Sequence, residues 1–382
     1  YEKRLTIYNS TLYAFSYEYG LIPRALIGSL YKLIDMILPV DLYTYDNAII
    51  FTLSETLIFF VLIIFFLRKT LLRARESDLG FLLVLWFMYG IFFSTMFATG
   101  ENFGRVDMYL LMIDIICLYL LLIRRFEWLI IPLCIAAVLI HEGFVFMYFN
   151  VPLVMLFYLI FTVEDEGVKK KYIRIFSLAL LLPSLLFLYF QFFSSPVDTE
   201  TYLLIYRKAR YVSRIDIPHV SLLEAELFKA DLSDIERNFH RENLIQLPFF
   251  LAMISPYIVF YFGLVKKLFS KKTIRGDIKK ALPYLAVMTG FLTLLPNFIL
   301  KVDYGRWIFA ATSYILLMFI MMFTVRDDLF TDCFFYETEG FKKHKGMILC
   351  LSFYPFLLTP FLDVYINRYL KMISDYVLNI LS

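Results

Sequence analysis

Long apolar stretches, interrupted by short polar segments, fill the chain from residue 48 to residue 362. The stretches are roughly 14 to 21 residues long, and about 17 to 25 apolar residues in a helix cross a bilayer. The pattern therefore predicts an all-α protein, a polytopic transmembrane helix bundle with about ten spans. We expect these spans at residues 49–67, 79–97, 108–123, 127–140, 143–162, 174–193, 246–265, 281–299, 307–324 and 346–362.

The polar segments between the stretches alternate in character. One set is rich in lysine and arginine, which marks cytoplasmic loops. It comprises residues 68–75, 124–125, 169–174, 266–280 and 342–345. The other set is expected on the outer side of the membrane, where a site built from it would open. It comprises residues 17–20, 101–107, 141–143, 194–243 and 303–307.

Two outer segments have the pattern of amphipathic helices that lie along the membrane surface, residues 23–40 after Pro23 and residues 221–243. The chain begins at Tyr1 without a methionine or a leader, so we expect an upstream segment with an eleventh span. The expected organisation is an outer segment with an interfacial helix (1–47), a first transmembrane helix group (48–193), a large outer loop (194–245), a second transmembrane helix group (246–362) and an outer C-terminal tail (363–382).

Composition supports a multi-pass integral membrane protein. Hydrophobic residues make up 60% of the 382 positions and charged residues only 19%, which is too apolar for a soluble domain. The net charge is only +3, so no basic field indicates a nucleic acid partner. The four cysteines have no metal-type spacing, and we expect neither a disulfide framework nor a metal site from them.

Arginines in the outer segments are candidates for phosphate binding, because a guanidinium group binds phosphate oxygens bidentately. The candidates are Arg24, Arg105, Arg210 and Arg306. Three acids accompany them as substrate-binding candidates, Glu101, Asp107 and Asp303. Each arginine also has a simpler interpretation, since it could pair with a neighbouring acid, lie on a solvated helix face or reach toward lipid headgroups.

His141 and Glu142 form the sharpest candidate pair, because they occupy a tight reversal where glycine, asparagine or serine would be usual. Partial burial would raise the pKa of Glu142 and make it a general base or acid near neutrality. Glu18 is a third catalytic candidate, as a base or as a metal ligand. The simpler interpretations are structural pairing for His141 and Glu142, and an exposed loop carboxylate for Glu18.

An acidic outer loop ahead of an interfacial helix, many spans and a large outer loop resemble membrane glycosyltransferases of the GT-C kind. The span number and the outer arginines also resemble bacterial capsule and O-antigen polymerases, with Arg105, Arg210 and Arg306 matching by location. The resemblance implies a polyprenyl-linked glycan donor and a glycan acceptor at the outer face of a bacterial cytoplasmic membrane. Glu18 stands where the first class has its outer acid, but no Asp-Asp or Asp-x-Asp accompanies it. No cofactor is expected, and a divalent metal is not supported by the spacing.

The leading hypothesis from sequence is therefore a glycosyltransferase that transfers or polymerises polyprenyl-linked sugars in cell-surface polysaccharide synthesis. In such an enzyme the arginines would stabilise the diphosphate leaving group, and a carboxylate or imidazole would take the proton of the acceptor hydroxyl. The alternative is a transporter or flippase for a lipid-linked sugar or an anionic solute. Transporters often have matching halves, and none is evident here. A structural or assembly subunit would leave the outer charges unexplained.

Overall fold

The computed structural model describes residues 12–38, 41–71, 104–193, 200, 204, 207–208, 246–272, 274–300, 304–342 and 346. Within these residues the protein is helical, with no strand, which confirms the all-α prediction. The chain divides into two compact units. The first combines Tyr1–Arg68 with Gly100–Lys229, and the second combines Lys69–Thr99 with Ala230–Ser382.

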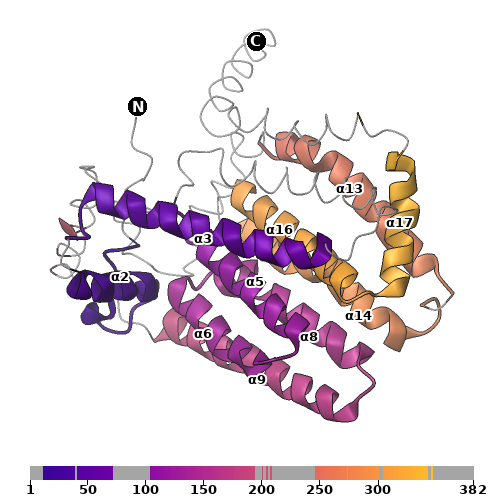
Figure 1. Ribbon diagram of the computed structural model, residues 1–382, viewed down its shortest axis with the longest axis horizontal. Helices are drawn as coiled ribbons and strands as arrows, with labels where there is room; N and C mark the ends of the chain where they lie inside the picture. Colours follow the sequence, from indigo (N-terminus) through magenta and orange to yellow (C-terminus); the bar gives the residue numbers. More distant parts are fainter. Residues whose placement is uncertain are drawn as a thin grey trace, which may run out of the picture. The chain divides into compact units, whose positions relative to one another are not determined.

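A group of packed helices forms most of the first unit. Helix α9 packs against both α6 and α8, and α5 packs against the same two helices (Figure 1). Helix α3 lies beside α5, where the rings of Phe65 and Tyr119 are 5.3 Å apart. The elements of this unit are η1 (Tyr17–Tyr19), α2 (Ala25–Ile37), α3 (Tyr45–Leu71), α5 (Asp107–Ile123), η4 (Glu127–Leu129), α6 (Ile130–Ile140), α7 (Phe144–Met147), α8 (Asn150–Thr162) and α9 (Glu166–Phe192).

The segment expected as one span at 143–162 is divided into α7 and α8, so this prediction was wrong in detail. Pro152 lies in the first turn of α8 and has no backbone N–H to donate to the carbonyl of Tyr148. A continuous helix would lose this hydrogen bond and force the proline ring against that carbonyl. Pro152 is thus well placed near a helix start, and the chain leaves the helix at Tyr148 and starts a new one at Asn150.

Among the described residues, four helices are long and apolar enough to cross a membrane by length and composition, and they correspond to four of the expected spans. They are Tyr45–Arg68, Glu166–Phe192, Ile278–Phe298 and Arg306–Thr324. The segments Glu127–Ile140 and Asn150–Thr162 are apolar but shorter. The expected spans 79–97 and 346–362 and the tail 363–382 lie outside the described residues, apart from residue 346. A span number near ten stays a prediction.

Helix α2 confirms the helix expected after Pro23. One side of it is buried, whereas Leu30, Leu33, Met36 and Ile37 are exposed. Exposed apolar side chains in a row are what a helix lying on a membrane surface presents. The second expected surface helix, 221–243, lies outside the described residues.

The second unit is organised around an aromatic core. Phe319 of α16 lies between Phe330 and Phe334 of α17 and Phe260 of α13, with ring centroids 5.4 to 6.5 Å apart. Helix α17 was not predicted, and Asp327 caps it by accepting the N–H of Phe330 at 2.7 Å. The helices of this unit are α13 (Gln246–Ser270), α14 (Ile278–Thr289), η6 (Gly290–Leu294), α15 (Leu295–Leu300), α16 (Tyr304–Thr324) and α17 (Asp328–Lys342).

Candidate functional site

The start of α2 and the reversal between α6 and α7 meet in the first unit, where α2 packs against α6. Close packing fixes the position of α2. A Cβ atom on Gly28 would lie 1.7 Å from the carbonyl oxygen of Phe15, so only glycine allows the preceding segment to lie this close. A buried apolar cluster of Ala14, Phe15, Ile22 and Ala25 then attaches η1 to the start of α2. Arg24, the residue before α2, is thereby directed at the α6–α7 reversal.

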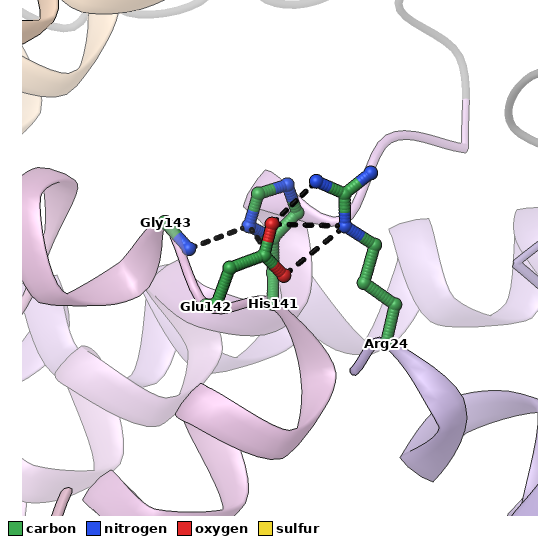
Figure 2. A network of polar contacts seen from close by, with 4 residues as sticks. All are labelled: Arg24, His141, Glu142 and Gly143. Atoms are coloured by element: carbon green, nitrogen blue, oxygen red, sulfur yellow. Dashed lines mark hydrogen bonds and ion pairs between the residues drawn. The ribbon is translucent and has the colours of Figure 1, made fainter. Parts of the chain in front are cut away.

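Arg24 and Glu142 form an ion pair at this meeting point (Figure 2). Nε of Arg24 lies 3.1 Å from both carboxylate oxygens, and Nη2 also donates to Oε1. The side chain of Glu142 is only 4% exposed, whereas that of Arg24 is 19% exposed. The carboxylate is thus enclosed more fully than the guanidinium group. Two predicted site residues that are 118 positions apart come into direct contact.

His141 completes the cluster and has a defined tautomer. The backbone N–H of Gly143 donates to Nδ1 of His141 at 2.8 Å (Figure 2). An Nδ1 atom that accepts a hydrogen bond carries no proton, so the neutral imidazole has its proton on Nε2. The ring is folded tightly over Gly143, because a Cβ atom there would lie 2.8 Å from Cε1. Nδ1 is also 3.8 Å from Oε2 of Glu142.

The pKa of Glu142 is lowered, whereas the sequence led us to expect a raised value. Burial raises this pKa, but the charge of Arg24, the neighbouring His141 and the hydrogen bonds from Arg24 lower it more, to about 2. The expectation of a raised value was wrong because it counted burial without the guanidinium group that the fold brings from α2. In this state Glu142 is ionised at neutral pH and is a weak base.

Arg24 itself has an unusual backbone conformation. Its φ of 62° and ψ of 13° lie in the left-handed region, which a residue with a Cβ atom rarely adopts. Such a conformation costs about 1 to 3 kcal/mol and persists where the surrounding structure imposes it. The packing of α2 and the ion pair with Glu142 provide this constraint.

Glu18 lies in a second cluster of the same unit. Both Lys32 of α2 and Lys208 donate to its carboxylate. The ammonium group of Lys208 also lies 5.2 Å from the ring of Tyr19 and 5.7 Å from that of Tyr43, within cation–π range. Burial raises the pKa of Glu18, but the two lysines lower it more, to about 2. Lys32 and the two tyrosine faces were missed by sequence reasoning, and no pattern marks them.

Asp107 is the first residue of α5, and Arg105 lies just before this helix. Asp107 is buried, and Oδ1 accepts a hydrogen bond from the hydroxyl of Tyr148 at 2.9 Å. This bond ties α5 to the break between α7 and α8, just after the reversal that carries His141. Arg105 is partly buried.

Arg306 belongs to the second unit, where it starts the candidate span of α16 and lies 5.6 Å from the ring of Trp307. Three other candidates, Glu101, Arg210 and Asp303, lie outside the described residues. The residues that the structure brings together are therefore Arg24, His141 and Glu142. No group of three or more metal-ligating side chains occurs in the part of the chain that the structure describes.

Two further buried acids, Glu55 and Asp114, lie inside helices of the first unit. Neither is among the site candidates named from the sequence. Glu55 of α3 is 5% exposed, and the hydroxyl of Tyr13 donates to it at 3.3 Å. An acid in the middle of the apolar run 49–67 was the available signal. Asp114 of α5 is fully buried. Neither of its carboxyl oxygens has a hydrogen-bond partner among the described residues.

Comparison of the chain with protein-family models, curated proteins and solved structures found no match.

Proposed function

We propose that this protein is a membrane glycosyltransferase that transfers or polymerises sugars carried on a polyprenyl diphosphate. The observation that carries the proposal is the enclosed cluster of Arg24, His141 and Glu142 in an all-helical protein with four candidate membrane spans. Such a cluster is expensive to bury, because the desolvation of two charges offsets much of their attraction. Buried ionisable groups in membrane proteins usually serve a function for this reason.

The chemistry of the cluster fits glycosyl transfer. A guanidinium group can stabilise a diphosphate leaving group, and a carboxylate can take the proton of an acceptor hydroxyl. The Nε2–H group of His141 is of the right kind to hold a sugar or phosphate oxygen. Binding at the outer face of a bacterial cytoplasmic membrane, with membrane lipids around the site, belongs to the same proposal and follows the lysine and arginine asymmetry of the loops.

A turnover assay tests this proposal. The purified protein is incubated with polyprenyl diphosphate-linked glycan, and the release of polyprenyl diphosphate and the length of the glycan are measured. We expect turnover in the parent and a loss of at least about 100-fold in Glu142→Gln, the scale of a missing general base. Glu166→Gln, on an exposed acid at the start of α9, is the control and should keep full activity. Absence of turnover with every lipid-linked donor would contradict the proposal.

A transporter or flippase is the second candidate, and the two buried acids Glu55 and Asp114 favour it. Carboxyl groups inside membrane helices often belong to proton or ion pathways. Uptake or flipping of a lipid-linked sugar in liposomes distinguishes this function. Movement of the lipid without release of diphosphate, lost in Asp114→Asn, would favour the transporter over the transferase.

A further inference from the structure

The guanidinium group of Arg24 is already engaged by a carboxylate. It donates to Glu142 through Nε and through Nη2, which is one complete edge of the guanidinium group. A phosphate that binds Arg24 bidentately through this edge competes with Glu142 for the same donors. The carboxylate of Glu142 and a bound phosphate would therefore compete for the guanidinium group of Arg24. When the phosphate binds, Glu142 loses its hydrogen bonds to Arg24.

The two members of the pair differ in how easily they can move. Glu142 lies on the short reversal between α6 and α7, and its side chain is almost completely enclosed. Arg24 has a long side chain, one fifth of which is exposed. An incoming anion reaches the guanidinium group first, and the arginine side chain can turn toward it. The carboxylate stays where the fold holds it.

Loss of Arg24 would change the chemistry of the carboxylate. In the part of the chain that the structure describes, the charged or titratable groups that contact Glu142 are Arg24 of the α2 start and His141 of its own reversal. Burial raises the pKa of the Glu142 carboxyl group and a nearby phosphate charge raises it further, whereas His141 still lowers it. Once Arg24 turns to the phosphate, Glu142 becomes a stronger base than it is in the ion pair.

We infer that the Arg24–Glu142 pair is a switch operated by the substrate, in which the phosphate of the donor takes Arg24 and the released Glu142 becomes the general base. The inference rests on the proposed function for the identity of the substrate. It adds that the base is inactive until the donor is bound, which prevents activation of an acceptor or of water in the empty site.

The transfer step balances as follows. The O–H bond of the acceptor breaks, and its proton goes to a carboxylate oxygen of Glu142. The acceptor oxygen forms a bond to the anomeric carbon, while the bond from that carbon to the phosphate oxygen breaks. The electron pair of the broken bond leaves on the polyprenyl diphosphate, whose charge Arg24 stabilises. After the diphosphate departs, Glu142 loses its proton to water and pairs with Arg24 again.

Carbodiimide labelling of the full chain tests the switch without turnover, because an apolar carbodiimide reacts with protonated buried carboxyl groups. The protein is labelled at pH 7 with and without inorganic pyrophosphate, and the modified peptides are measured by mass spectrometry. We expect labelling of Glu142 to rise about tenfold or more with pyrophosphate, which is the effect of one unit of pKa. Glu127, which is also buried and pairs with Lys171 at 2.7 Å, is the internal control and should not change.

Arg24→Ala provides the second arm. Without the guanidinium group, Glu142 should label strongly in the absence of pyrophosphate and should not respond to its addition. Unchanged labelling of Glu142 at saturating pyrophosphate in the parent would overturn the switch, and so would an equal rise at Glu127. The switch can fail while turnover of the lipid-linked donor persists, or hold while no glycan is transferred, so the two proposals fail separately.

Discussion

Nε of Arg24 lies 3.1 Å from both carboxylate oxygens of Glu142, although the two residues are 118 positions apart in the sequence. The pair joins the start of α2 to the reversal between α6 and α7, and it is therefore a tertiary contact as well as a candidate site. The contribution of this pair to stability, its response to pH and the contact of Gly143 with His141 can each be measured. The contacts of Glu18 with Lys32 and Lys208 can be measured as well.

Replacement of either member of the pair should be more harmful than replacement of both. Arg24→Met leaves a buried carboxylate without its partner, and we expect it to lower the free energy of unfolding by about 3 kcal/mol. Glu142→Met should have a similar cost. The double variant should be clearly more stable than the sum of the two costs implies, because no charge then remains buried. Thermal unfolding in detergent measures all three, and simple additivity would show that the pair does not couple the two segments.

Acid should weaken the fold through Glu142. The pKa of this carboxyl group falls from 4.5 to about 2 in the folded protein. Its contribution to stability is therefore complete above about pH 4.5 and is lost as the pH falls toward 2, with a total of about 3 kcal/mol. Glu142→Gln should reduce the difference between the melting temperatures at pH 7 and pH 3. Glu166→Gln, at a largely exposed acid, should leave the difference unchanged, and equal sensitivity of Glu142→Gln and the parent would refute the prediction.

A methyl group at position 143 should displace the imidazole of His141. The Cβ atom of Gly143→Ala would lie 2.8 Å from Cε1 and 2.9 Å from Nδ1, so the ring must move and the hydrogen bond from the Gly143 N–H is lost. We expect a lower melting temperature and reduced turnover. Addition of His141→Ala removes the obstacle and should recover the melting temperature but not the turnover. A further fall of the melting temperature on addition of His141→Ala would show that the methyl group does not clash with the imidazole ring, which would contradict this prediction.

The contact between Glu18 and Lys208 spans 190 positions and can be trapped chemically. A water-soluble carbodiimide should form an amide between this carboxylate and the ammonium group, and a second one with Lys32. Peptide mass spectrometry identifies both products. Lys208→Arg keeps the charge but cannot form the amide, so the first product should vanish while the second remains. Absence of the first product in the parent, with the second product present, would contradict the contact between Glu18 and Lys208.

Sequence alone determined the helical class and four helices that are long and apolar enough to cross a membrane, because the length of an apolar run is a local property that can be compared with the thickness of a bilayer. It also singled out Arg24, His141 and Glu142, since ionisable residues beside apolar segments are costly to keep. The division of 143–162 was not predicted, and Pro152 alone does not predict it, because α9 continues through Pro183.

Tertiary structure decided which charges meet, and with that the chemistry of the site. The pKa of Glu142 is lowered instead of raised because α2 brings a guanidinium group to it, and no spacing in the sequence records that approach. The same holds for Glu18, whose partner Lys208 comes from a distant segment. Electrostatic energy depends on distance in space and on burial, and both are set only when the chain has packed.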